Sequence, residues 1–213
     1  MTINSGIKKI LFDFDGVIVD SNEMKRECFL KVANLYGDRI QEQFHQYCEN
    51  HPGGTRFEKM RWLNQKLAGT GADISRNELI DQYSHCVKAG LLRAASVEGL
   101  RVMKQRYPDA TWSIVSAAPA VEIRWYLEQK GWLGLFEDGV FGAPRSKKTV
   151  LDEEYNAAEI RQNAVFLGDS KSDFKVANEF GVDFVFVRKW SRDPWLAEYE
   201  DVPSVESVSD FFR

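Results

Sequence analysis

Residues 8–21 read KKILFDFDGVIVDS, an apolar run that ends in a pair of acidic residues followed by glycine. Consecutive apolar side chains indicate that both faces of this segment are buried, as in the strands of a parallel sheet. Asp13 and Asp15 are two residues apart, which places their side chains on the same side of an extended segment. The stretch therefore predicts a buried strand with two carboxylates at its end.

The Asp13–Asp15 pair is flanked by aromatic residues, where charge is costly unless a cation is bound. Ligands of α/β proteins bind beyond the carboxyl ends of the strands, which favours a functional interpretation. An acidic turn that ends in Gly16 is the alternative without function. A calcium-binding loop is excluded, because its sixth position requires glycine and is Ile18 here.

Four further segments have the pattern of buried strands, at 111–116, 139–142, 164–168 and 182–187. Helical patterns separate most of them, at 98–107, 121–130 and 171–180. The last two of these patterns end at glycines, as helices with glycine caps do. Strands that alternate with helices predict an α/β fold with a doubly wound, Rossmann-like parallel-sheet core.

Residues 22–95 break this alternation, because they contain apolar stripes at helical spacing and no convincing strand. Ser75 and Glu78 have the spacing of a capping box that opens a helix. Breaks at 51–54 and 69–73 divide the segment into roughly four helices. This is too much chain for a crossover connection. We therefore expect an α/β core formed by residues 1–21 and 96–213, with a small all-α domain inserted at 22–95.

Polar side chains also follow the other predicted strands. Ser116 ends the second strand, Lys147 and Lys148 follow the third, and Asp169 and Asp173 follow the fourth. Each feature has an explanation without function. These are a turn begun by the serine, a solvated charge pair at a helix start, and an N-cap aspartate with an exposed acid nearby.

Taken in order, the four segments resemble the motifs of the haloacid dehalogenase superfamily: DxDGxxxDS, a strand ending in serine or threonine, a lysine, and GDxxxD. The chain reads DFDGVIVDS at 13–21, then Ser116, Lys147, and GDSKSD at 168–173. The helical insertion after the first motif is similar to the cap of the phosphatase branch, which includes phosphoglycolate phosphatases and beta-phosphoglucomutases.

The resemblance implies catalytic roles for four residues. Asp13 would be the nucleophile that forms an aspartyl-phosphate. Asp15 would protonate the leaving oxygen and then take a proton from water. Ser116 would hydrogen-bond a phosphoryl oxygen, and Lys147 would neutralise charge that grows on the equatorial oxygens.

The resemblance also implies a metal site. The Asp13 carboxylate, the Asp15 main-chain carbonyl and Asp169 would hold Mg²⁺, and Asp173 would bind or orient that shell. Ligands that are all oxygen and rich in carboxylate suit Mg²⁺ rather than zinc.

Two details of the motifs refine the expectation. Family members often carry Lys-Pro at the third motif, whereas this chain has Lys147-Lys148. Ser146 before Lys147 matches the common small residue, so Lys147 is preferred. The founding dehalogenases lack the second aspartate of the first motif, so Asp15 argues for phosphoryl transfer and against carbon–halogen cleavage.

The break at 51–56 resembles the specificity loop of family caps, which would make Gly54, Thr55 and Arg56 substrate-binding residues. Arg56 is expected to pair with a second anionic group or with sugar hydroxyls of the substrate. A helix-starting loop with Arg56 in solvent is the alternative.

These observations predict a Mg²⁺-dependent phosphoric monoester hydrolase that acts on a small phosphorylated metabolite, such as a sugar phosphate. A sugar phosphomutase, which returns the phosphoryl group to a sugar, is the main alternative. A regulatory or binding module without catalysis is disfavoured, because every motif carboxylate is present.

Composition limits the partners and the compartment. The chain has 28 Lys and Arg against 32 Asp and Glu, and no basic block, which argues against nucleic-acid binding. Cys28, Cys48 and Cys86 are widely spaced, so we expect free buried thiols, which fit a reducing cytoplasm. No signal peptide or membrane-spanning apolar run is visible, so we expect a cytoplasmic protein without a membrane partner.

Overall fold

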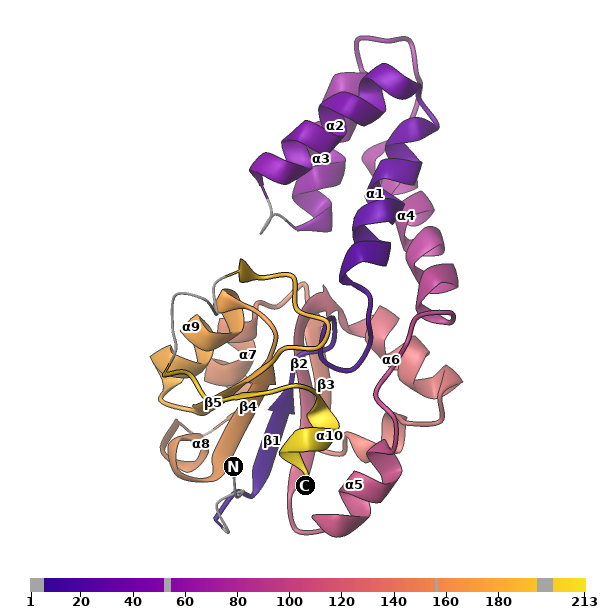
Figure 1. The fold of residues 1–213 in the computed structure, drawn as a ribbon. Helices are drawn as coiled ribbons and strands as arrows, with labels where there is room; N and C mark the ends of the chain where they lie inside the picture. Colours follow the sequence, from indigo (N-terminus) through magenta and orange to yellow (C-terminus); the bar gives the residue numbers. More distant parts are fainter. Residues whose placement is uncertain (1–5, 52–54, 156, 195–200) are drawn as a thin grey trace. The chain divides into compact units, whose positions relative to one another are not determined.

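The computed structural model describes residues 6–51, 55–155, 157–194 and 201–213 (Figure 1). The chain forms two compact units. One comprises the residues up to Asn22 together with Ala94–Arg213, and the other comprises Glu23–Arg93. We call them the α/β unit and the helical unit.

The α/β unit is built on a parallel sheet with the strand order β3-β2-β1-β4-β5-β6. The strands are β1 (Lys9–Phe12), β2 (Thr111–Pro119), β3 (Gly139–Ala143), β4 (Ala164–Gly168), β5 (Asp183–Val187) and β6 (Ser204–Val205). Figure 1 shows β1 in indigo between β2 and β4. The predicted doubly wound parallel sheet is confirmed, and only the short strand β6 was not anticipated.

Helices cover both faces of the sheet, which explains the continuous apolar runs. Successive residues of β1 point to opposite faces. Leu11 belongs to a buried cluster with residues of α7 (Lys147–Glu154), α8 (Ala157–Asn163) and α9 (Lys171–Phe180). Phe12 packs on the other face, where its ring lies 5.1 Å from the Trp112 ring and 5.8 Å from the Phe136 ring.

The remaining helices of the α/β unit are α5 (Leu100–Arg106), α6 (Ala120–Gln129), the 3-10 helix η1 (Leu133–Leu135) and α10 (Val208–Phe211). The helices predicted at 98–107, 121–130 and 171–180 are thus confirmed as α5, α6 and α9. No helix in the described part of the chain is long and apolar enough to cross a membrane.

The helical unit consists of the helices that the apolar stripes predicted, with α1 beginning at the last residue of the α/β unit. They are α1 (Asn22–Asn34), α2 (Asp38–Asn50), α3 (Arg56–Leu67) and α4 (Arg76–Leu91). The capping box of Ser75 and Glu78 opens α4 as expected, and Thr55 and Glu58 form a second one at α3. Buried Phe44, Leu63 and other apolar residues form the core of this unit.

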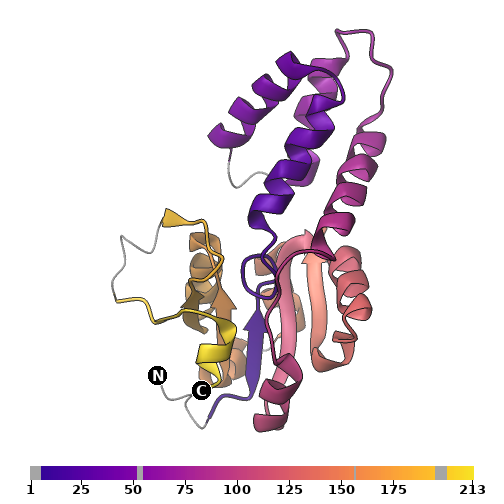
Figure 2. The same cartoon turned by 45° about the vertical axis from the view of Figure 1, so that its right-hand side comes forward.

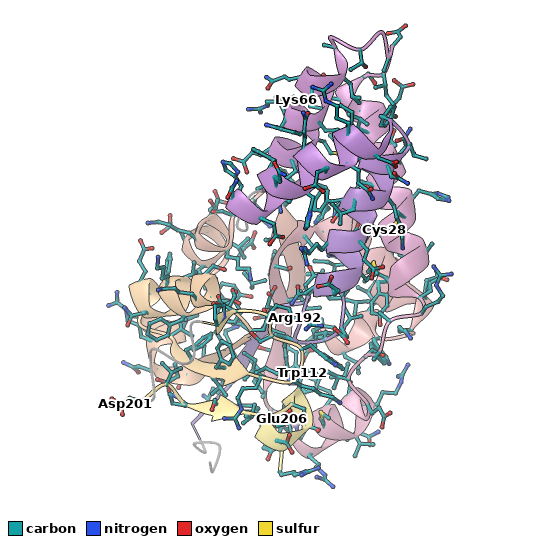
Figure 3. All side chains as sticks on the ribbon, turned by 45° about the horizontal axis from the view of Figure 1, so that its top comes forward. Cys28, Lys66, Trp112, Arg192, Asp201 and Glu206 are labelled. Atoms are coloured by element: carbon teal, nitrogen blue, oxygen red, sulfur yellow. A yellow bond between two sulfur atoms is a disulfide. The ribbon has the colours of Figure 1, made fainter. Side chains whose placement is uncertain are left out.

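One expectation about the cysteines is wrong. Cys48 is free and buried, but Cys28 on α1 and Cys86 on α4 form a disulfide, with a Cα–Cα distance of 5.7 Å. Figure 2 shows α1 and α4 side by side, and Figure 3 labels Cys28 beside the yellow sulfur atoms. The two residues are 58 positions apart in the sequence, and helix packing brings them together. Because two of the three cysteines are bonded to each other, the cysteines no longer support the expectation of a reducing compartment.

The disulfide should stabilise the helical unit, because it closes a loop of 58 residues in the unfolded chain. Chain entropy predicts that replacing both cysteines (Cys28→Ser with Cys86→Ser) lowers the free energy of unfolding by about 4 kcal/mol. Urea unfolding followed by circular dichroism, with and without dithiothreitol, measures the change. The double variant should not respond to dithiothreitol. Three titratable thiols in the unreduced, unfolded wild-type protein would contradict the bond.

Candidate active site

The strand order brings the first and fourth motifs together. After β1 the chain builds β2 and β3 on one side of the sheet, then β4 and β5 on the other. Loops leave β1 and β4 in opposite directions at such a switch point, which opens a crevice at their carboxyl ends. Phe12 pairs with Leu167, and the Asp13 amide donates to the Leu167 carbonyl at 2.9 Å. This register sets Asp13 beside the loop that begins at Gly168.

Three buried carboxylates meet at the carboxyl ends of β1 and β4. Asp13, Asp169 and Asp173 each offer an oxygen atom, and these atoms lie within 4.8 Å of one another. The three residues are 6%, 5% and 0% exposed. Lys147 Nζ lies 3.0 Å from Asp13 Oδ1 and also donates to Asp173 Oδ1. The cluster thus contains three carboxylates and one ammonium, which contacts two of them, and it carries excess negative charge if all three acids are ionised.

The pKa values reflect this crowding. Burial, followed by the charges of Asp13 and Asp173, raises the pKa of Asp169 to about 9. Burial also raises the pKa of Asp13 to about 6, although Lys147 opposes the rise. Burial alone would lower the pKa of Lys147, but the two carboxylates beside it raise the pKa above its ordinary value. The lysine is therefore a permanent cation, and Asp13 and Asp169 resist ionisation without a further positive charge.

Two glycines allow the loops to approach this closely. Gly16 has φ +76°, and a Cβ atom there would lie 2.0 Å from Asp169 Oδ2. A Cβ atom at Gly168 would lie 2.4 Å from the Cβ of Asp173. Any side chain at either position would displace an acid of the cluster, which explains the glycines within the first and fourth motifs.

The cluster fits a hard divalent cation. Its donors are carboxylate oxygens, which suit Mg²⁺. Asp13 Oδ1 is buried, and within the described residues its ion pair with Lys147 lacks hydrogen-bond alignment. Burial raises the pKa values of Asp13 and Asp169, so a cation bound beside them would favour their charged forms. Asp13, Asp169 and Asp173 are the side chains suited to hold the ion.

Asp15 lies next to this cluster but has another partner. It is partly exposed, and the buried Ser21 hydroxyl donates to its Oδ1. Ser21 is the last residue of the first motif, and its hydroxyl binds the second aspartate of the same motif. This bond helps to orient the Asp15 carboxylate.

The structure separates the two candidate lysines. Ser146 caps α7, which points the following Lys147 into the buried cluster. Lys148 is exposed and pairs with Glu179 on the surface. Ser116 is 2% exposed and belongs to β2, the strand next to β1, which continues beyond the predicted end at Ser116 to Pro119. Its Oγ accepts from the Ala118 amide at 3.2 Å. The turn expected as an alternative therefore exists at the predicted site residue.

The predicted substrate-binding residues belong to the helical unit. Gly54 lies outside the described residues, and Thr55 is the N-cap of α3. Arg56 is partly buried: its Nη1 donates to Ser84 Oγ at 3.1 Å, and its guanidinium lies 4.9 Å from the centre of the Tyr83 ring. These contacts contradict the alternative of an arginine side chain in free solvent.

Sequence reasoning missed two residues that support Asp169 and a third, Asp193, that holds the neighbouring start of α9. Asn22 Nδ2 donates to Asp169 Oδ2 at 2.8 Å, and Ser191 Oγ donates to the Asp169 carbonyl at 2.5 Å. Asp193 accepts from the Lys171 amide at 2.8 Å, which ties the chain after β5 to the start of α9. Asn22 directly follows the first motif, and this position is the one signal in the sequence that could have identified it as part of the site. The segment around Ser191 is an ordinary polar loop in sequence.

Solved structures share this fold over nearly their whole length. A haloacid dehalogenase-like hydrolase from Streptococcus pneumoniae has 18% identity and a TM-score of 0.68, with 99% of this chain and 100% of that chain covered. A beta-phosphoglucomutase from Clostridium difficile has 17% identity and a TM-score of 0.65, with 96% and 92% covered. A variant of CbbY from Rhodobacter sphaeroides in complex with xylulose 1,5-bisphosphate has 16% identity and a TM-score of 0.67, with 94% of each chain covered.

At these identities the likeness establishes the fold alone. No curated protein is similar enough in sequence to count as a relative. The sequence pattern of haloacid dehalogenase-like hydrolases, however, matches residues 10–187 and so includes all four motifs and the helical unit. The chain belongs to the haloacid dehalogenase-like hydrolase family.

Proposed function

We propose that the protein is a Mg²⁺-dependent phosphatase that hydrolyses a small phosphomonoester through an aspartyl-phosphate at Asp13. The observation that carries the proposal is the buried cluster of Asp13, Asp169 and Asp173 around Lys147. One edge of the sheet thus holds a carboxylate that can act as nucleophile, a cation for the phosphoryl group, and oxygen ligands for a metal. If the cluster served only as a structural ion pair, one acid beside Lys147 would be enough, whereas the cluster contains three.

In the first step, an Asp13 oxygen attacks the phosphorus of the substrate. A bond from oxygen to phosphorus forms, and the bond between phosphorus and the leaving oxygen breaks. Asp15 donates a proton to that oxygen, so the product leaves as an alcohol. The bond from Ser21 holds the Asp15 carboxyl group for this transfer.

In the second step, Asp15 takes a proton from water, and the water oxygen attacks the phosphorus of the aspartyl-phosphate. The bond between phosphorus and Asp13 breaks, and inorganic phosphate and the free carboxylate result. Lys147 stays protonated throughout and offsets charge on the equatorial oxygens, and Ser116 donates to one of them. The ammonium beside Asp13 supports this role for Lys147.

The metal would be held by the Asp13 carboxylate, the Asp15 carbonyl and Asp169, with Asp173 completing or orienting the shell. When bound, Mg²⁺ supplies the positive charge that lets an anionic nucleophile approach an anionic phosphate. Asn22 and Ser191 fix Asp169 through the bonds described above, and such outer contacts preserve ligand geometry.

The substrate is a phosphorylated metabolite of the sugar phosphate class, with Gly54, Thr55 and Arg56 contacting its non-reacting part. The partly buried guanidinium of Arg56 supports this assignment, since the Ser84 hydroxyl and the Tyr83 ring hold it in place at the start of α3. We place the enzyme in the cytoplasm, where phosphorylated metabolites are found.

Release of inorganic phosphate from an aryl phosphate and from a panel of phosphorylated metabolites tests this function. We expect turnover with Mg²⁺ and none with excess chelator. Turnover of no compound would favour a binding module. Isomerisation of a sugar phosphate that needs a bisphosphorylated activator would identify a phosphomutase instead.

Replacing the nucleophile should separate catalysis from stability. Asp13→Asn is expected to lower kcat by about 10³-fold or more, because an amide is a poor nucleophile. In chelator at pH 8 it should raise the free energy of unfolding by about 1–3 kcal/mol. The pKa of Asp13 rises from 3.8 to about 6 on folding, so the wild-type protein loses stability as pH rises through that window.

Urea unfolding at pH 8 and phosphate release measure both effects of Asp13→Asn. Asp109→Asn is the control, because Asp109 is an exposed acid of the same unit. It should change stability by no more than about 0.5 kcal/mol. A chelated Asp13→Asn protein that is less stable than wild type would show that the carboxylate is a structural group.

The two acidic motifs should divide the work between proton transfer and metal binding. Asp15→Ala is expected to lower kcat by about 10²–10⁴-fold while it keeps most of the Mg²⁺ affinity, because its ligand is a main-chain carbonyl. Asp169→Ala should weaken Mg²⁺ binding by about tenfold or more, because it removes a ligand. Calorimetric titration with Mg²⁺ checks this. An equal loss of affinity in both variants would contradict the division.

A further inference from the structure

The side-chain amide of Asn22 donates to two acceptors beside the proposed metal site. Its Nδ2 lies 2.8 Å from Asp169 Oδ2 and 3.4 Å from the Trp190 carbonyl oxygen. An amide nitrogen carries two hydrogens, so both are used. Asp169 itself is only 5% exposed. One of the two oxygens of this buried carboxylate is therefore engaged by a residue that lies outside the four motifs.

The bond between Asn22 and Asp169 has little room to open. A Cβ atom at Gly16 would lie 2.0 Å from Asp169 Oδ2 and 2.6 Å from Asn22 Nδ2, so the bonded pair packs against the Gly16 main chain. The main chain of Asp169 is held as well, because its carbonyl accepts from Ser191 Oγ. The carboxylate is thus fixed at both ends, which keeps Oδ2 turned toward the Asn22 amide.

The other two acids of the cluster also have engaged oxygens. Asp173 Oδ1 accepts from Lys147, and Asp173 Oδ2 accepts from the Ser170 hydroxyl at 2.7 Å and from the Ser170 amide at 3.1 Å. Asp13 Oδ1 lies 3.0 Å from Lys147 Nζ. A cation that used both oxygens of any of these acids would therefore compete with a protein group.

The number of oxygens that a carboxylate offers distinguishes Ca²⁺ from Mg²⁺. Ca²⁺ accepts bidentate carboxylates and about six to eight ligands at about 2.3–2.6 Å, whereas Mg²⁺ requires near-octahedral geometry at about 2.0–2.1 Å. We propose that Asn22 is a positioning residue that restricts Asp169 to one ligand oxygen, Oδ1, and so makes the site discriminate against Ca²⁺. The inference rests on the metal site of the proposed function and adds the residue that sets its ion selectivity.

Calorimetric titration of the full chain with Mg²⁺ and with Ca²⁺, in separate experiments without substrate, tests this role. Asn22→Ala removes the amide and frees Oδ2. We expect the ratio of the Ca²⁺ dissociation constant to the Mg²⁺ dissociation constant to fall by about tenfold or more, because Mg²⁺ loses an oriented ligand whereas Ca²⁺ gains a second oxygen. An unchanged ratio would overturn the role of Asn22, even if both ions bind more weakly.

Ser191→Ala is the matched control, because it also removes a bond to Asp169 but leaves Oδ2 with Asn22. It should weaken binding of both ions by a similar factor and keep the ratio. If it changes the ratio as much as Asn22→Ala does, any loosening of Asp169 has this effect, and the proposal is overturned. Asn178→Ala, at an exposed position of α9, should leave both dissociation constants unchanged.

Crystal structures of the Ca²⁺-loaded proteins provide a second readout. In Asn22→Ala, both oxygens of Asp169 should lie within about 2.3–2.6 Å of Ca²⁺. In the wild-type protein only Oδ1 should lie at that distance, with Oδ2 bonded to Asn22. Binding of Ca²⁺ by both Asp169 oxygens in the wild type would overturn the proposal. If Asn22→Ala fails to fold, Asn22→Ser, whose shorter side chain also gives up the bond to Oδ2, takes its place in both measurements.

The outcomes separate this inference from the proposed function. A wild-type protein that binds both ions, with a ratio that Asn22→Ala does not change, overturns the role of Asn22 and leaves the phosphatase standing. A ratio that changes as expected in a protein without turnover leaves the role standing and overturns the phosphatase. Binding of neither ion at about 10 mM would overturn both, because it removes the metal site itself.

Discussion

Three buried carboxylates lie together with one ammonium at the carboxyl ends of β1 and β4, and the rest of the site follows from this imbalance of charge. The register of β1 against β4 fixes Asp13 beside the fourth motif, and glycines let the two loops touch. Asn22 and Ser191 hold Asp169 from outside. Such an arrangement is unfavourable by itself, because burial and like charges resist ionisation. A bound divalent cation would supply the positive charge that the cluster lacks.

The sequence was sufficient for the fold and for the acids of the site. Buried parallel strands leave continuous apolar runs, and the polar residues at their ends must meet at one sheet edge. The choice between Lys147 and Lys148 was harder, since both follow the same strand. The structure supports Lys147, because the Ser146 cap sets the phase of α7 and turns Lys148 toward Glu179.

Features that depend on packing between distant segments escaped the sequence. Cys28 and Cys86 have no spacing that suggests a bond, and only the contact of α1 with α4 joins them. Ser191 supports Asp169 from a polar loop whose sequence has no motif that would indicate this contact.

The most direct measurement of the central claim is the stability of the wild-type protein against Mg²⁺ concentration at pH 8. If the buried carboxylates require a cation, the free energy of unfolding should rise by about 1.4 kcal/mol for each tenfold increase of Mg²⁺ above its dissociation constant. Asp169→Ala should respond only at higher concentrations. A wild-type protein whose unfolding is the same in chelator and in about 10 mM Mg²⁺ would contradict the account.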